Sequence, residues 1–361
     1  MNRYRHQIAS LFATLLLMSF VVSAQPVSED MTFSSGDLVL AGTLTLPAGS
    51  GPHPVVITIS GSGPQTRAGE VPGVPGYGLF AELAPFLAER GVGVLRFDDR
   101  GVGGSDGDNS TATSGDLAGD AEAAVKYLQS RPEVDALWIG LLGHSEGGMI
   151  APMIAARHPG IAFVIALAPP VAEALEGLVR QERLMLETEG LPQDLVEAQV
   201  AMTREALELT RAGAWEELDA LLRATIARQL AALPEEQRAA FGDPEEATEM
   251  LLAQTMTQYQ GWMHFFLSHD SRADWERLRV PALVVFGERD VQVDPIFHRQ
   301  ALEEVADASL VAIETLPSAN HLFQHATTGG VTEYAELPPQ LTPSLFETLE
   351  VWLRANLPSD E

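Results

Sequence analysis

The 361-residue sequence contains no cysteine and few basic residues. Without cysteine the chain forms no disulfide bond, uses no thiol nucleophile and holds no thiolate-ligated metal. Lys and Arg together number 22 against 50 Asp and Glu, which gives a formal net charge of −28 at pH 7. A surface of this charge repels nucleic acid, anionic membranes and polyanionic substrates. We therefore expect no nucleic acid and no membrane among the partners of the folded protein.

Long apolar runs are scarce, and the one that stands out, residues 8–22, lies at the N-terminus. It follows Arg3 and Arg5 and precedes small residues that end at Ala24, which is typical of a secretory signal peptide. The run is short for a membrane span. We expect cleavage near Ala24 and a location in the periplasm or outside the cell. No cysteine follows this site, so a lipid anchor is not expected.

Several cofactor motifs are missing as well. The Gly-rich stretch at 60–65 has no Gly-Lys-Ser/Thr after it, and G-x-G-x-x-G is incomplete there, which argues against a phosphate-binding loop. The histidines are scattered, with no H-E-x-x-H pattern. We therefore expect neither a metal nor an organic cofactor.

Apolar runs alternate with helical patterns along most of the chain. Continuous apolar runs, typical of strands buried in a parallel sheet, occupy 55–59, 92–97, 137–142, 161–167, 280–286 and 310–313. Helical spacing occupies 77–90, 116–130, 148–157 and 343–356. An antiparallel hairpin is expected at 31–46. The order of these segments predicts an α/β fold with a mainly parallel central sheet and helices on both faces.

Composition changes between the strands at 161–167 and 280–286. Residues 171–262 are rich in Ala, Leu, Glu, Gln and Met at helical spacing, for example at 195–211 and 215–230. We interpret 171–262 as an inserted helical cap that shapes access for a substrate. The predicted organisation is then a signal peptide at 1–24, a core built from 25–170 and 263–361, and this cap.

The pentapeptide from Gly143 to Gly147 has the form G-x-S-x-G, with a predicted strand before it and a predicted helix after it. A strand, a sharp turn and a helix hold a serine hydroxyl exposed at the end of a sheet, and the glycines permit the turn. Ser145 is therefore the expected nucleophile. The pattern is weak on its own, because a chain with many glycines produces it by chance.

A Gly-rich loop at 60–65 follows the strand at 55–59. In the fold that the pentapeptide indicates, one half of the oxyanion hole lies in a loop of this kind. The other half is the backbone N–H of the residue after the nucleophile. We expect the backbone N–H groups of Ser62 and Glu146 to form the two halves.

An acid and a histidine follow the last two predicted strands. Asp290 lies in the loop after 280–286, with Asp294 as the less favoured rival, and His321 lies in the loop after 310–313. The order Ser145, Asp290, His321 is the one this fold requires. His321 would take the proton from the serine, and Asp290 would orient the imidazole.

Other polar residues near these motifs are assigned structural roles. His144 adjoins the nucleophile and is expected to point away from it, while His298 and His325 lack the position after a strand. Asp99 and Arg100 are interpreted as residues that pin the loop after 92–97 beside the site.

Four motifs together, at 60–65, 98–101, 143–148 and 320–324, resemble those of bacterial α/β-hydrolase serine esterases of the EstD type. That group is related to the dienelactone hydrolases and the serine aminopeptidases. The resemblance implies an α/β-hydrolase fold and a carboxylesterase that cleaves small-molecule esters with short acyl groups. An aminopeptidase or amidase with the same three residues is the alternative, and carboxylates in the cap would then bind the substrate ammonium.

Further classes fit less well. A thioesterase for coenzyme A esters would have to bind a polyanion, an epoxide or haloalkane hydrolase needs Asp where Ser145 stands, and a non-catalytic binding module should have lost part of the triad.

The aromatic cluster at 262–266 closes the predicted cap. Its Phe265 and Phe266 are interpreted either as lining for an acyl pocket or as ordinary cap packing.

Overall fold

The computed structural model describes residues 25–358, so the predicted signal peptide at 1–24 lies outside the described residues. An eight-stranded sheet forms the centre, in the order β1-β2-β4-β3-β5-β6-β7-β8. The edge strand β1 (Val27–Ser35) pairs antiparallel with β2 (Leu38–Leu46), β2 pairs antiparallel with β4, and all other pairs are parallel. The predicted mainly parallel sheet is confirmed. The other strands are β3 (His53–Ile59), β4 (Gly93–Phe97), β5 (Val134–His144), β6 (Phe163–Leu167), β7 (Ala282–Gly287) and β8 (Val311–Leu316).

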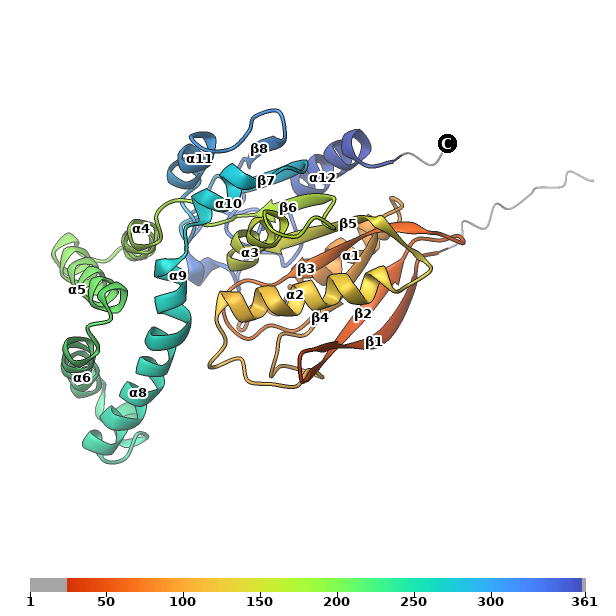
Figure 1. Cartoon of the computed structure of the whole chain (residues 1–361). Helices are drawn as coiled ribbons and strands as arrows, with labels where there is room; N and C mark the ends of the chain where they lie inside the picture. Colours follow the sequence, from red (N-terminus) through yellow and green to blue (C-terminus); the bar gives the residue numbers. More distant parts are fainter. Residues whose placement is uncertain (1–24, 359–361) are drawn as a thin grey trace, which may run out of the picture.

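Helices cover both faces of this sheet, because the central strands are apolar on both sides. In β3, Val55 and Ile57 face one hydrophobic core while Val56 faces the other, as alternation along a strand requires. One core is closed by α2, α3, α10 and α11, and the opposite core by α1 and α12 (Figure 1). These helices are α1 (Leu79–Ala88), α2 (Ser114–Gln129), α3 (Glu146–Ala155), α10 (Ser271–Arg277), α11 (Pro295–Glu303) and α12 (Pro343–Asn356).

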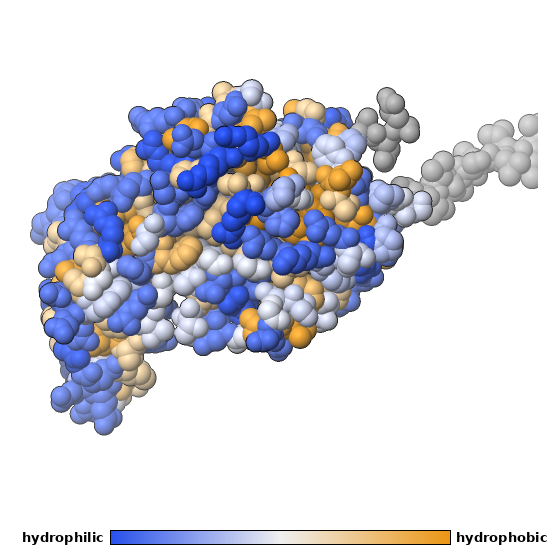
Figure 2. Space-filling model, viewed as in Figure 1, coloured by the Kyte–Doolittle hydropathy of each residue, from blue (hydrophilic) through white to orange (hydrophobic). Residues whose placement is uncertain are grey.

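A run of helices without a described strand lies between β6 and α10. It comprises α4 (Ala174–Thr188), α5 (Gln193–Ala212), α6 (Trp215–Ala232), α7 (Glu235–Ala239), α8 (Pro244–Gln258), the π-helical turn η1 (Tyr259–Met263) and α9 (His264–Ser268). Helices α4 to α9 extend away from the sheet at the left of Figure 1 and enclose two small hydrophobic cores of their own. Hydrophilic residues dominate the lower part of this arm in Figure 2.

Two local features differ from the sequence expectations. Helix α2 begins at Ser114 rather than at 116, because Thr113 and Asp116 form a reciprocal capping box. Helices α8, η1 and α9 follow one another without a break, so the expected cap boundary at 262/263 lies inside continuous helix. A π-helical turn shifts the register of the residues after it, and such turns are frequent at functional sites.

Among residues 25–358, no helix combines the length and the apolar character needed to cross a membrane.

Candidate active site

The candidate nucleophile lies at a sharp turn between β5 and α3. Ser145 has φ 52° and ψ −118°, a strained conformation for a residue with a side chain. Its N–H donates to the carbonyl of Leu167 on β6 at 2.8 Å, which holds the turn against the neighbouring strand. The turn is also tight: a Cβ on Gly143 would lie 1.9 Å from the carbonyl oxygen of Gly147. Glycine at this position lets the helix start directly behind the strand.

Asp290 and His321 meet at the carboxyl edge of the sheet, after β7 and β8. The His321 Nδ1–H donates to Asp290 Oδ2 at 2.8 Å, and both residues are buried, at 4% and 3% exposure. The N–H groups of Gln292 and Val293 donate to the other carboxylate oxygen at 2.8 Å each. With the proton on Nδ1, the free lone pair of the imidazole lies on Nε2, where a general base needs it.

Asp294, the rival acid, has a different role. Its Oδ1 accepts from the N–H of Ile296 at 2.9 Å and caps helix α11, while its Oδ2 pairs with Arg180 of α4. The structure thus brings Asp290, and not Asp294, to the candidate base.

His144 lies against His321, with the ring centroids 4.8 Å apart. Its Nε2–H donates to the backbone carbonyl of His321 at 2.9 Å. Burial, together with the neighbouring His321 ring, lowers the pKa of His144 to about 3, so the ring stays neutral and keeps this bond. His144 therefore supports the histidine loop, a role that its place beside the nucleophile did not reveal. His325 is exposed on the same loop.

The loop after β3 passes directly beside the nucleophile. A Cβ on Gly61 would lie 3.2 Å from Cβ of Ser145. Within residues 25–358, neither the backbone N–H of Ser62 nor that of Glu146 donates to another group, and both residues line the same cavity as Ser145. These two N–H groups are thus available to an oxygen bound at the serine.

Asp99 holds the loop after β3 in place through two hydrogen bonds. Its Oδ1 accepts from the hydroxyl of Ser60 at 2.5 Å and its Oδ2 from the N–H of Gln65 at 2.9 Å. Burial raises the pKa of Asp99 to about 7, although both bonds act in the opposite direction. Arg100 pairs with Asp120 of α2 at 2.8 Å. These contacts agree with the structural roles expected for Asp99 and Arg100.

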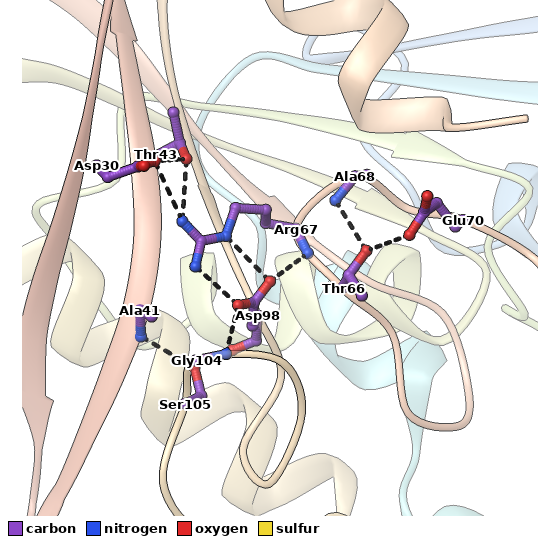
Figure 3. A network of polar contacts seen from close by, with 10 residues as sticks. All are labelled: Asp30, Ala41, Thr43, Thr66, Arg67, Ala68, Glu70, Asp98, Gly104 and Ser105. Atoms are coloured by element: carbon purple, nitrogen blue, oxygen red, sulfur yellow. Dashed lines mark hydrogen bonds and ion pairs between the residues drawn. The ribbon is translucent and has the colours of Figure 1, made fainter. Parts of the chain in front are cut away.

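A second clamp on the same loop was not foreseen from the sequence (Figure 3). The backbone N–H and the Nε of Arg67 both donate to Asp98 Oδ1, at 2.8 and 3.0 Å, and Nη2 donates to Oδ2 at 2.7 Å. The same guanidinium reaches Thr43 of β2 at 3.0 Å, and the N–H of Gly104 donates to Asp98 at 3.0 Å. The loop after β3, the loop after β4 and strand β2 are thereby tied together.

The side chain of Glu146 is buried, with 1% exposure. Its Oε1 accepts from the Ser114 hydroxyl at 2.6 Å and from the Trp262 indole N–H at 2.8 Å, while Oε2 has no partner in the described structure. Burial raises the pKa of Glu146, and the hydrogen bonds from Ser114 and Trp262 act in the opposite direction. This carboxyl joins the start of α2 and the π turn η1 to the nucleophile turn. From the sequence, only the backbone N–H of Glu146 was expected to take part in the site.

A cavity of about 400 Å³ contains Ser145 and His321 on its wall. Phe266 lines it, but the interpretation of Phe265 as a pocket residue is wrong. Phe265 packs on the first turn of α2 and stacks on His269, with ring centroids 5.9 Å apart. Successive residues on a helix point about 100° apart, and in this helix Phe266 points to the cavity while Phe265 points to α2.

Two carboxylates and no Lys or Arg are found on this wall. Glu70 is exposed and accepts from the Thr66 hydroxyl at 2.9 Å, and the other is the buried Glu146. The wall residues that come from 171–262 carry no carboxylate: Ala172, Ala174, Gly177, Leu178, Gln181 and Trp262. In the described part of the chain, no group of three or more His, Cys, Asp or Glu is arranged to hold a metal ion.

The chain is similar to known hydrolases in sequence. The esterase EstD of Thermotoga maritima is 29% identical over 284 residues, which is 79% of this chain. The match spans 58% of the length of that esterase. Residues 74–325 match the family described as serine aminopeptidase, S33.

Solved structures show the same fold. The α/β hydrolase GrgF of Penicillium sp. sh18 superimposes with a TM-score of 0.54 at 20% identity, over 92% of this chain and 98% of that one. An esterase of Pyrococcus furiosus gives a TM-score of 0.53 at 17% identity, over 92% of each chain. Since the matched family covers well over half of the sequence, the chain belongs to the serine aminopeptidase S33 family and has the α/β-hydrolase fold.

Proposed function

We propose that this protein hydrolyses carboxylic esters through an acyl-enzyme on Ser145. The observation that carries the proposal is the hydrogen-bonded pair of Asp290 and His321 in the same cavity as a serine held at a strained strand-to-helix turn. A nucleophile, a base and an orienting acid at one site are the parts that acyl transfer needs.

The proposed reaction has two halves. His321 Nε2 removes the proton from Ser145 as its Oγ attacks the acyl carbon, and the N–H groups of Ser62 and Glu146 stabilise the oxyanion. The protonated imidazole, stabilised by Asp290, then gives the proton to the leaving alcohol. In the second half, His321 activates water in the same manner, and the acid product leaves.

The size and the charge of the cavity support small esters as substrates. A volume of about 400 Å³ accommodates a small molecule, and the wall has no cation that would attract an anionic group. The 29% identity to an esterase supports the same reaction class. Within this class, we propose esters with short acyl groups as the substrates.

The family's description favours a second candidate, an aminopeptidase or amidase with the same three residues. That activity needs a carboxylate to bind the substrate ammonium. Of the two carboxylates on the wall, Glu146 is buried, and burial raises its pKa and so disfavours the charge that an ammonium needs, while Glu70 is exposed to solvent. The cap helices add none, which supports the ester reading over the amide one.

The test is turnover of p-nitrophenyl esters of increasing acyl length beside a panel of aminoacyl anilides. Wild-type protein is compared with Ser145→Ala and with Ser309→Ala, which removes an exposed hydroxyl outside the cavity. We expect ester turnover that declines with acyl length, is lost in Ser145→Ala and is retained in Ser309→Ala. Cleavage of the anilides alone would favour the peptidase, and full ester activity in Ser145→Ala would disprove the mechanism.

We also propose that the protein works outside the cytoplasm, since the leader at 1–24 has the pattern of a signal peptide. Expression of the full chain in a Gram-negative host followed by N-terminal sequencing of the periplasmic fraction tests this. A mature N-terminus near Gln25 is expected. Recovery of the uncleaved chain in the cytoplasm would contradict the proposal.

A further inference from the structure

His298 of α11 lies on the cavity wall although the proposed mechanism does not use it. The side chain is 3% exposed, and its Nδ1 accepts two hydrogen bonds, from the N–H groups of Val171 and Ala172 at 2.9 and 3.0 Å. A nitrogen that accepts from two N–H donors carries no proton. In the neutral ring the proton is therefore on Nε2, and the backbone fixes this tautomer.

The Nε2–H has no hydrogen-bond acceptor among residues 25–358. The ring lies on the cavity wall, so a molecule bound in the cavity can reach this N–H. The wall thus presents a hydrogen-bond donor that a bound molecule would satisfy.

Helix α4 keeps the space beside the ring open. Gly177 faces His298, and a Cβ there would lie 3.2 Å from Cε1 and 3.5 Å from Nε2. The ion pair of Arg180 with Asp294, at the start of α11, joins the two helices close to this point. The absence of one methyl group therefore leaves the donor uncovered.

We propose that His298 determines substrate specificity: its Nε2–H donates a hydrogen bond to an oxygen acceptor of the substrate, so that esters bearing an ether, carbonyl or hydroxyl oxygen away from the scissile bond are preferred over plain alkyl esters. The inference rests on the proposed ester hydrolysis and deepens it. The donor recognises the substrate and takes no part in bond cleavage.

The protonation of His298 is compatible with this role. Burial lowers its pKa to about 4, against the opposing effect of Asp290 and Asp294. At neutral pH the ring is uncharged, keeps the tautomer described above and donates from Nε2 only. An oxygen acceptor without formal charge is the partner that such a donor suits.

The experiment compares esters of matched shape in which one CH₂ is replaced by oxygen. In the acyl arm, p-nitrophenyl methoxyacetate is paired with p-nitrophenyl butyrate. In the alcohol arm, 2-methoxyethyl acetate is paired with butyl acetate. The esters of a pair differ in intrinsic reactivity, so the quantity compared is their kcat/KM ratio in wild type against the same ratio in each variant.

Two variants remove the donor in different ways. His298→Asn places an amide oxygen near the former Nδ1, where it can accept from Val171 and Ala172, but does not reach the position of Nε2. Gly177→Ala leaves the imidazole intact and places a methyl group over it, at a helical position that alanine favours. Thermal unfolding checks that both variants are folded.

We expect the oxygen-to-methylene ratio to fall about three- to tenfold in both variants in at least one arm, as loss of a neutral hydrogen bond predicts. In His298→Asn, turnover of the plain alkyl ester should fall less than turnover of its oxygen-bearing partner. A ratio unchanged in both variants and in both arms would overturn the inference. The same pairs, measured as dissociation constants on Ser145→Ala by ligand-observed NMR, read recognition without turnover and so separate failure of this inference from failure of ester hydrolysis.

Discussion

Asp290 and Asp294 follow the same strand four residues apart and are both buried, yet only Asp290 contacts His321. Asp294 instead caps α11 and pairs with Arg180. Burial and proximity to the site therefore do not distinguish the two aspartates. Their hydrogen-bond partners do.

This difference gives a matched pair of variants. Asp290→Asn should lower kcat on a short ester by about 10⁴-fold, because an amide no longer fixes the imidazole tautomer or stabilises its charge. Asp294→Asn should keep kcat within about tenfold and lose at most about 1 kcal/mol of stability, because asparagine caps a helix as well as aspartate does and only the ion pair with Arg180 is lost. Steady-state kinetics and thermal unfolding measure both effects. Equal losses of kcat in the two variants would contradict the assignment of the acid.

Asp99 should make stability depend on pH. Its pKa, raised to about 7 from an ordinary value near 4, means that the folded state binds more protons than the unfolded state between these pH values. The free energy of unfolding should therefore fall as pH rises from about 4 to about 7. A shift of this size corresponds to roughly 4 kcal/mol at most.

Asp99→Asn is the test, because asparagine can accept from Gln65 N–H and donate to the Ser60 hydroxyl without titrating. Urea unfolding of wild type and variant from pH 4 to pH 8 should show a smaller decline for the variant. Parallel curves over this range would show that Asp99 does not cause the decline.

At the scale of elements, the turn between β5 and α3 depends on close backbone contact. A methyl group on Gly143 would meet the carbonyl oxygen of Gly147 at 1.9 Å, and the next nearest atoms are also backbone, of Gly147 and Gly148. Gly119, on the surface of α2, has no atom within 4 Å of the same methyl position. The fold therefore has no room for a side chain at Gly143, whereas it has room for one at Gly119.

Gly143→Ala should therefore abolish folding or the arrangement of Ser145, with loss of ester turnover. Gly119→Ala should stabilise the protein by roughly 0.5 to 1 kcal/mol, because alanine has the higher helix propensity. Circular dichroism, thermal unfolding and ester assay of both proteins provide the comparison. A folded and fully active Gly143→Ala protein would contradict the tight turn.

Sequence alone predicted the sheet well, because its strands are short apolar runs bounded by loops. The strand at 55–59 became β3 at 53–59, and the helix expected at 343–356 has those bounds. Helices α10 and α11 were missed, since each is shorter than ten residues and shows little helical periodicity, although each begins at an aspartate cap. Asp294 was considered as a catalytic acid when its side chain in fact starts α11.

The site was predicted in part for a similar reason. Ser145, Asp290 and His321 follow strand ends in a required order, so their meeting can be expected from sequence. The contacts of Glu146 with Trp262, 116 residues away, and of His298 with Val171, 127 residues away, have no local pattern. The sequence could not predict which of Phe265 and Phe266 lines the cavity, because the directions of their side chains depend on the helix register after the π turn.

At the scale of the whole molecule, charge acts in two opposing ways. With a net charge of −28, the acidic side chains repel one another and destabilise the folded state. Helices of the cap are also joined by exposed ion pairs of opposite sign, such as Arg183 with Glu197 at 2.6 Å and Arg211 with Glu173 at 3.1 Å. Salt screens both, but exposed pairs contribute only about 0 to 1 kcal/mol each.

Repulsion among 50 acidic residues therefore outweighs the pairs at pH 7, and added salt should stabilise the protein. We expect Tm to rise as NaCl is increased from about 0.01 M to 0.5 M, over which the screening length falls from roughly 30 Å to below 8 Å. Near pH 4.5, the isoelectric point, repulsion vanishes and only the pairs remain to be screened, so Tm should stay level or fall. Differential scanning calorimetry at both pH values measures the two responses. If salt raised Tm equally at both, the cause would be salt exclusion from the surface rather than net charge.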